Sequence, residues 1–196
     1  MNKPNSYEET QASGDYTPVE LGGHKLVIKQ VNEKKSSTGK DMIVVLFDFA
    51  PGDAQAGYFM DQFKNDIRPD KKWPNQATQY IVTEDADGNC SRSFKTFTTC
   101  VEHSNAGFSI PWGNKFCEGL KNKLIGGVFG VVEEEYNGET KKKRRLRWFC
   151  SVDKAADAEV PEEKLLPQKN GGQSVSDAGN GFMNIPDGIG EELPFN

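Results

Sequence analysis

The chain has 196 residues, a mass of 21.7 kDa and 35% hydrophobic residues, so we expect one globular domain with appendages rather than two domains. The net charge of -5 is uneven: residues 151–196 hold three Lys and nine Asp or Glu, a balance of -6, which leaves +1 for residues 1–150. No apolar run approaches the roughly 18 residues of a membrane helix and the N-terminus lacks a signal peptide's apolar stretch, so we expect no membrane contact and a cytoplasmic location.

The two ends of the chain differ in composition from its middle. Residues 1–17 are polar and predict a flexible N-terminal arm. From residue 168 onward, Gly, Asn and Ser spacers separate very few apolar residues, too few to offset the entropy cost of ordering the segment. We therefore expect a disordered acidic tail over residues 168–196 and a folded domain over residues 18–167.

The first half of this domain has a strand, turn and strand pattern. Residues 24–31 are rich in β-branched side chains and mixed in polarity, and the segment 34–40, "KKSSTGK", is typical of a turn. Residues 42–49 form an apolar run of the kind found in strands that are buried on both faces. Together these segments predict a β-hairpin.

One helix and a second hairpin follow. Phe94, Phe97 and Val101 recur at intervals of three and four residues, which predicts a helix over 93–104 that buries one face. Residues 124–132 are a strong strand whose glycines suit a sharply bent barrel strand. An Asn-Gly turn signal comes next, and residues 141–150 are predicted to return as its partner strand.

Charges in the second hairpin indicate its register. If Asn137-Gly138 is a two-residue loop, Glu134 faces Lys141 and Glu133 faces Lys142. Opposite charges across two strands help to fix their alignment, so part of this basic run has a structural role.

The rest of the basic run is a candidate binding surface. The same register gives Lys143, Arg145 and Arg147 no acidic partner, and it sets Arg147 opposite Val128. Alternation along a strand places these three cations on one face together with Phe149. Cations that follow phosphates and rings that stack on bases are the groups that single-stranded nucleic-acid sites use. The alternative interpretation is a solvated charged strand.

The opposite face of the same strand is the candidate core face. Alternation places Leu146 and Trp148 on it. The predicted register brings Leu146 near Phe129 and sets Trp148 over Gly127. We therefore expect Trp148 to be packed in the core and Phe149 to be available for stacking.

A second possible stacking group lies in a loop rich in Pro and Asn. Trp73 follows Lys71 and Lys72 there, and an exposed Trp beside two Lys suggests a platform for a base. Binding and packing both remain open for Trp73. For Trp112 the sequence favours packing.

Catalytic and metal-binding patterns are scarce. The chain has no phosphate-binding G-x-x-x-x-G-K, no G-x-S-x-G and no H-E-x-x-H, and its four cysteines have no C-x-x-C pairing. We therefore expect no enzyme activity, no metal, no cofactor and reduced, mostly buried thiols. The enzymatic alternative is a Mg²⁺-dependent nuclease that uses Asp70 with Glu139 and Lys141, although the last two also belong to the charged hairpin tip.

Residues 18–167 contain, in order, the segments "TGK", "FDFAPGDAQAGYF", "FKTFTTCVEHSN", "GLKNKLIGGVFGVVEEEYNGE" and "RWFCSVDK". In the order and spacing of these segments the chain resembles the single-stranded-DNA-binding proteins that are encoded by phages and prophages of Gram-positive bacteria. The resemblance implies a mainly β fold, a five-stranded antiparallel OB-type barrel that binds single strands across one face. Residues 77–83, "ATQYIVT", would then supply the fifth strand.

The end of the chain is similar to another known feature. Bacterial single-stranded-DNA-binding proteins finish in an acidic tip close to Asp-Ile-Pro-Phe, and a similar tip occurs here, followed by Asn196: Glu191, Glu192, Leu193, Pro194 and Phe195. The acids suit a basic rim and the apolar side chains can fill a pocket, so this tip is expected to recruit replication or recombination proteins. A plain solubilising tail is the alternative.

These observations give one expected function. The chain is expected to bind single-stranded DNA with little sequence preference during phage replication or recombination. The nucleic-acid-binding residues are expected to be Lys143, Arg145, Arg147, Phe149, Trp73, Lys71 and Lys72. The alternative is an adaptor that binds another replication protein and does not touch DNA. The oligomeric state is not predictable from the sequence.

Overall fold

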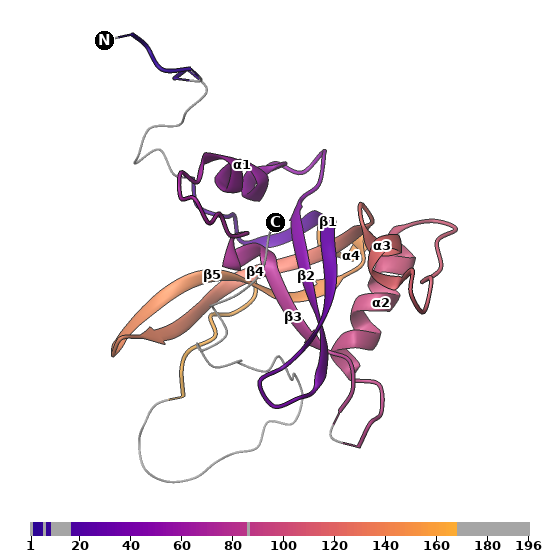
Figure 1. Ribbon diagram of the computed structural model, residues 1–196. Helices are drawn as coiled ribbons and strands as arrows, with labels where there is room; N and C mark the ends of the chain where they lie inside the picture. The colour runs from indigo at the N-terminus through magenta and orange to yellow at the C-terminus, as the bar shows by residue number, and fades with distance from the viewer. Residues whose placement is uncertain (1, 6, 9–16, 86, 168–196) are drawn as a thin grey trace.

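A computed structural model describes residues 2–5, 7–8, 17–85 and 87–167 of the chain. Figure 1 shows a strongly curled sheet with helices at its ends. The strands are β1 (Gly22–Lys35), β2 (Asp41–Phe49), β3 (Thr78–Val82), β4 (Leu124–Tyr136) and β5 (Glu139–Cys150). The helices are α1 (Tyr58–Asn65), the 3₁₀ turn η1 (Asn75–Ala77), α2 (Arg92–Ser104), α3 (Phe116–Leu120) and α4 (Val152–Ala156).

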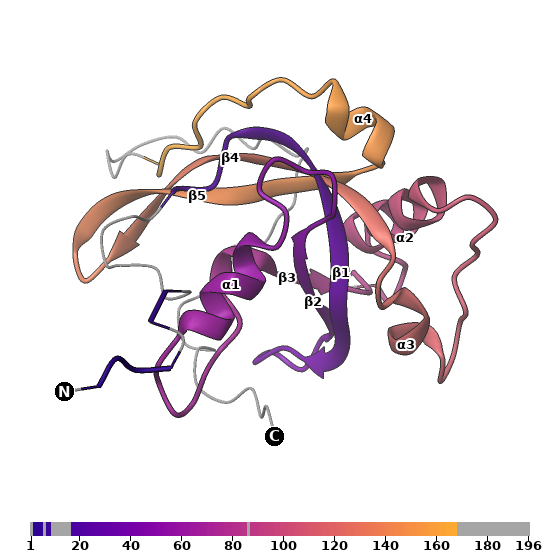
Figure 2. The same ribbon diagram turned by 90° about the horizontal axis from the view of Figure 1, so that it is seen from above.

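The five strands form one antiparallel sheet in the order β3-β2-β1-β4-β5. The helix α2 connects β3 to β4 at one end of the sheet (Figures 1 and 2). The sheet is open, because no hydrogen-bonded ladder joins its two edge strands in the described ranges. One side-chain bond spans the opening, from Gln76 Nε2 to the carbonyl oxygen of Arg144 at 2.9 Å. The prediction of a mainly β, five-stranded antiparallel fold is confirmed.

The local turn signals and the spacing of apolar residues led to correct elements. The turn before β2 is closed by a hydrogen bond from the amide of Ser36 to the carbonyl of Lys40 at 2.8 Å. At the second hairpin, Asn137 and Gly138 have φ angles of 51° and 79°, the left-handed values that a two-residue hairpin turn requires. The predicted helix is α2, and its N-cap Ser91 accepts a hydrogen bond from the amide of Phe94. None of the helices in the described ranges is long and apolar enough to cross a membrane.

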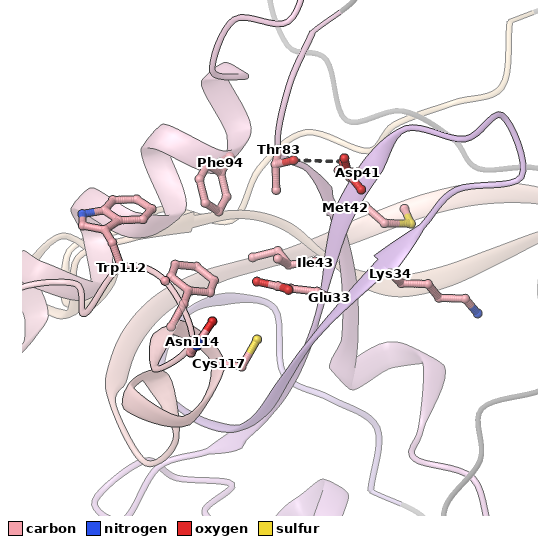
Figure 3. Close-up of a pocket in the computed structure, with 12 residues that line it drawn as sticks. Glu33, Lys34, Asp41, Met42, Ile43, Thr83, Phe94, Trp112, Asn114 and Cys117 are labelled. Carbon is pink, nitrogen blue, oxygen red and sulfur yellow. Dashed lines mark hydrogen bonds between the residues drawn. The ribbon is translucent and has the colours of Figure 1, made fainter.

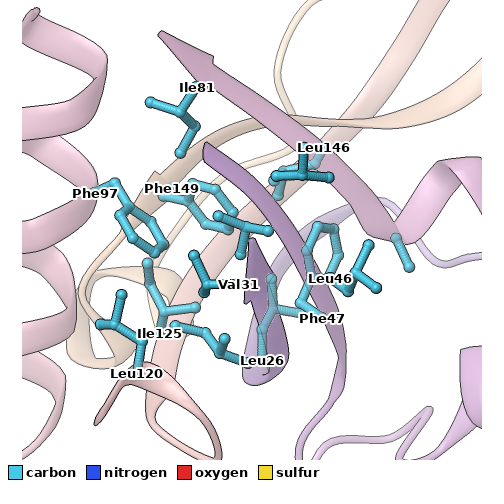
Figure 4. Packing of buried hydrophobic residues seen from close by; sticks show 14 of the residues in the cluster. Leu26, Val31, Leu46, Phe47, Ile81, Phe97, Leu120, Ile125, Leu146 and Phe149 are labelled. Carbon is cyan, nitrogen blue, oxygen red and sulfur yellow. The ribbon is translucent and has the colours of Figure 1, made fainter. Parts of the chain in front are cut away.

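Aromatic side chains fill the space inside the curled sheet. Phe47 of β2 lies at their centre, with ring centroids 5.8 Å from Phe149, 6.3 Å from Phe129 and 6.2 Å from Phe59. At the α2 end the core is closed by Phe97, whose ring centroid is 5.4 Å from that of Phe149 (Figure 4). All five rings are buried, so they contribute a large share of the apolar area removed from water.

Glycines in β4 permit close packing on both of its faces. A Cβ on Gly126 would lie 2.5 Å from the carbonyl oxygen of Ser151, where the chain enters α4. A Cβ on Gly127 would lie 2.5 Å from Leu26 Cδ1 on the core side. These distances are too short for any side chain, so the predicted role of the glycines in shaping this strand is explained by close approach rather than by unusual dihedral angles.

Three α-helices of the described chain, α1, α3 and α4, have no counterpart in the sequence prediction. The helix α1 is held by Asp48, a buried carboxylate at the end of β2. Its oxygens accept hydrogen bonds from the backbone amides of Phe49, Phe59 and Met60 at 2.9, 3.0 and 3.2 Å. The last two amides belong to the first turn of α1, so a residue from another element provides the N-terminal capping of this helix.

Candidate nucleic-acid interface

A β-bulge at Arg147 decides which side chains of β5 face outward. Gly130 is opposite Arg145 and Phe129 is opposite Leu146, as predicted, but Val128 is opposite Trp148 rather than Arg147. The extra residue shifts the alternation by one position. The prediction that Arg147 faces Val128 is therefore wrong.

The bulge exchanges the expected roles of two aromatic residues. Phe149 lies opposite Gly127 and is only 5% exposed, with its ring in the core. Trp148 is 38% exposed. Because its partner Val128 and the Arg145 partner Gly130 are two residues apart on β4, Trp148 shares a face with Arg145. The predictions of Phe149 as a stacking ring and of Trp148 as a core residue are both wrong.

The outer face of β5 carries cations, but an acid neutralises part of their charge. Glu134 accepts hydrogen bonds from Arg145 Nε at 2.7 Å and Arg145 Nη2 at 3.0 Å, and it forms an ion pair with Lys143 Nζ at 2.9 Å. The predicted register of Glu134 with Lys141 is correct, yet its side chain extends diagonally to the next two cations. The prediction that these cations have no acidic partner is wrong for Lys143 and Arg145.

Glu134 is charged at any physiological pH. Its hydrogen bonds with Arg145, and then those with Lys143, lower the pKa of Glu134 from 4.5 to about 2. Because the folded-state pKa lies below the unfolded-state value, the stability that this cluster contributes is present at neutral pH. It is lost as the pH falls from about 4.5 to about 2.

The chain after α4 lies beside this face. Arg147 Nη1 donates a hydrogen bond to the carbonyl oxygen of Glu162 at 2.8 Å, and a Cβ on Gly130 would lie 2.6 Å from Pro161 Cγ. Lys164 exchanges backbone hydrogen bonds with β4, where its amide donates to Val131 at 2.9 Å. Residues 161–164 thus run beside β4, joined to it by one isolated bridge at Lys164, and cover part of the surface between Arg147 and β4.

The second predicted cluster is not a stacking platform. Trp73 is only 8% exposed, its Nε1 donates to the carbonyl of Ala77 at 3.2 Å, and its ring centroid is 5.6 Å from that of Phe63. The expectation of an exposed ring is wrong, and the packing alternative describes Trp73. Lys71 and Lys72 are half-buried, and the ammonium group of Lys71 donates to the carbonyl of Lys64 at 2.9 Å.

Trp112 is exposed, whereas the sequence favoured a packed ring. It is 65% exposed, and its ring stacks on Phe116 with centroids 5.6 Å apart and planes 18° apart. The sequence favoured packing for Trp112 and left exposure open for Trp73, so the local signals misled for both. Their different positions result from contacts with distant elements.

The groups considered for metal binding and catalysis are dispersed. Among the residues that the structure describes, no three His, Cys, Asp or Glu side chains are grouped as metal ligands would be. All four cysteines are free, with Cys90 exposed and the other three half-buried, so the prediction of mostly buried thiols is wrong in degree. At the hairpin tip, Glu139 is paired with Lys141 at 2.9 Å.

Some predicted features lie outside the described residues. They include the tip with Glu191, Glu192, Leu193, Pro194 and Phe195, and the predicted tail over 168–196 as a whole. Most of the predicted N-terminal arm is also outside, whereas residues 17–19 contact the domain: the carbonyl of Val19 accepts a hydrogen bond from Arg144 Nη1 at 2.5 Å. No family model matches the chain, and no curated protein matches it either.

Proposed function

We propose that the chain binds single-stranded DNA with little sequence preference, along the outer face of β5. The observation that carries this proposal is the bulge, which brings an exposed Trp148 onto the face that holds Lys143, Arg145 and Arg147. A strand there could place its phosphates beside the cations and stack one base on the indole ring. The mainly β sheet supports the proposal, since folds of this kind present such faces to oligonucleotides.

The charge of the face is sufficient for this role in spite of Glu134. Three cations and one carboxylate leave an excess of two positive charges on this part of β5. The ion pairs hold the side chains in place, so less rotamer entropy is lost when a phosphate binds. Affinity should therefore depend on salt, because each phosphate contact with a single strand contributes a slope of about 0.7 in log K against log salt.

The direct test is fluorescence anisotropy with a labelled poly-dT strand at two salt concentrations. We expect binding that weakens as salt is raised, whatever the sequence of the strand. Absence of salt-dependent binding to every oligonucleotide would reject the proposal.

The adaptor alternative has one observation in its favour. Glu134 and residues 161–164 occupy part of the face that DNA would need. A surface of paired charges partly covered by its own chain also suits a protein partner with complementary charges. Under this alternative the domain binds a replication protein and shows no affinity for oligonucleotides in the anisotropy experiment.

Replacing Glu134 should strengthen DNA binding. Glu134→Gln removes the carboxylate that holds Arg145 and Lys143, so both cations become available to phosphates. We expect affinity for poly-dT to rise several-fold at 0.15 M salt, with a steeper salt slope, because phosphates no longer compete with a carboxylate for these two cations. Anisotropy titrations at several salt concentrations measure both quantities.

A neighbouring residue supplies the matched control. Glu133→Gln makes the same charge change on β4. The Glu133 carboxylate, however, accepts a hydrogen bond from the amide of Leu166, and Glu133 is opposite Lys142 rather than Lys143 or Arg145. We expect it to raise affinity less than Glu134→Gln. Equal effects of the two variants would show that only net charge matters and would contradict the role assigned to Glu134.

We also propose that the chain acts in phage replication or recombination in the host cytoplasm and recruits partner proteins through residues 191–196. The support is the order of the residues, two acids followed by Leu193 and Phe195 around Pro194. Deleting residues 191–196 should abolish capture of replication or recombination proteins from a host lysate and leave DNA affinity equal or slightly higher. Capture of the same proteins by the truncated chain would contradict this role.

A further inference from the structure

A pocket of about 540 Å³ lies between the distal end of the β1–β2 hairpin and the α2–α3 region, away from the outer face of β5. Figure 3 shows how its side chains converge: Glu33 and Ile43 point from β1 and β2 toward the aromatic side chains on the other wall. The volume is in the range of pockets that bind small ligands. Packing of the core does not require an open pocket at this place, and neither does DNA binding along β5.

Three aromatic rings form one wall of the pocket. The ring centroid of Phe94 is 6.1 Å from that of Trp112 and 5.8 Å from that of Phe116, and Trp112 stacks on Phe116. Trp112 projects into solvent, although burying an indole of this size would normally be favourable. An aromatic surface left open beside a pocket is suited to a planar ligand that stacks on it.

The opposite wall carries a hydrogen-bond acceptor. Glu33 is exposed, so water solvates its carboxylate in the free protein, and the neighbouring Asp41 is paired with Lys35 at 2.8 Å. A ligand that lies between Glu33 and the rings displaces this water, so it must offer the carboxylate an N–H donor in exchange. Lys34 also lines the pocket, and Figure 3 shows its side chain pointing away from the aromatic wall.

We propose that this pocket binds one base of the bound single strand and prefers a base with an exocyclic amino group to thymine. Cytosine and adenine present an amino group from which a carboxylate can accept a hydrogen bond, whereas the one base donor of thymine, N3–H, lies between two carbonyl oxygens that Glu33 would repel. This inference rests on the proposed DNA binding and adds base selection to it. Under this proposal, the outer face of β5 binds a strand of any sequence, and the pocket adds a base preference at one nucleotide.

The pocket and the outer face of β5 are formed by different elements of the fold. Figures 1 and 2 both show the β4–β5 hairpin on one side of the β1–β2 hairpin and the α2–α3 region on the other. A strand that reaches both must cross the sheet. The cations of β5 and the pocket would then bind different nucleotides, so their contributions can be separated by mutation.

The test compares labelled dC20 with labelled dT20 in anisotropy titrations of the full chain. We expect dC20 to bind about tenfold more tightly. Glu33→Gln should remove this preference, because an amide can pair with either base. Trp112→Ala should weaken dC20 binding by about five- to hundredfold with a smaller effect on dT20. The control Trp148→Ala should weaken both strands equally.

A second measurement tests the pocket without the cations of β5. The indole N–H signal of Trp112 in a ¹H–¹⁵N spectrum of the full chain should shift on addition of dCMP and much less on addition of dTMP. A Trp112 signal that responds to neither nucleotide, or equally to both, overturns the pocket proposal. A response to arginine amide but not to dCMP also overturns it and assigns the pocket to a basic peptide, because carboxylates and rings also bind cations.

The outcomes separate the two proposals. Equal, salt-dependent binding of dC20 and dT20, unchanged in Glu33→Gln and Trp112→Ala, overturns the pocket and leaves DNA binding intact. Failure of both oligonucleotides to bind, together with a Trp112 response to dCMP, rejects the proposed function along β5 while supporting a nucleotide pocket.

Discussion

Reversing the charge of Arg145 and Arg147 together will weaken binding to single-stranded DNA by at least about tenfold at 0.15 M salt. The loss of two phosphate contacts should reduce the salt slope by about 1.4, at about 0.7 for each contact. The two introduced carboxylates add repulsion, and Glu134 then lacks its bidentate partner. Anisotropy titrations of Arg145→Glu/Arg147→Glu at several salt concentrations measure both effects.

The control for this variant is Lys154→Glu on α4, which reverses one charge, half of the change in the double variant, at an exposed position on another element. We expect a small loss of affinity from the change in net charge alone. Circular dichroism establishes that each variant is folded. A folded double variant with unchanged affinity would reject β5 as the binding strand and direct attention to another face of the sheet.

The strands could be read from the sequence because their signals are local. A continuous apolar run, an Asn-Gly turn and paired charges indicate β2 and the β4–β5 hairpin without knowledge of any distant residue. The helix α1 could not be predicted in this way. Its first turn is capped by Asp48, which belongs to the preceding strand and interacts across ten residues or more.

The candidate site was predicted in part, and the error has one cause. The positions of Lys143 and Arg145 follow from alternation counted from the turn, and they are correct as far as Leu146. Beyond this residue a single bulge inverts the pattern, which exchanges Trp148 and Phe149. Bulges occur where the sheet bends sharply around its core, and two strands alone do not specify them.

The burial of the other two tryptophans also depends on distant contacts. Two lysines beside Trp73 suggested exposure, but its ring packs against Phe63 of α1, a helix that the sequence did not indicate. Trp112 lies between a proline and a glycine, a context that carries no information about solvent. Its exposure follows from how α2, α3 and the β1–β2 hairpin meet.

Replacing Asp48 with Ala will destabilise the fold more than any other change considered above, by about 3 kcal/mol or more. Three backbone amides lose their acceptor, and a buried donor without a partner costs about 1 to 3 kcal/mol. Two of these amides begin α1, which holds Phe59 against Phe49 with ring centroids 5.2 Å apart. Urea unfolding followed by circular dichroism measures the loss.

Two further variants, Asp48→Asn and Asp61→Ala, test whether Asp48 stabilises α1 through its hydrogen bonds or through its negative charge. Asp48→Asn keeps one side-chain oxygen, which can continue to accept from Phe49 and Phe59, so we expect it to lose only the bond to Met60 and about a third of the stability lost in Asp48→Ala. Asp61→Ala removes an exposed carboxylate from the first turn of α1 and should cost less than about 1 kcal/mol. If Asp48→Asn is as unstable as Asp48→Ala, the negative charge and not the acceptor geometry holds α1, and the capping role is contradicted.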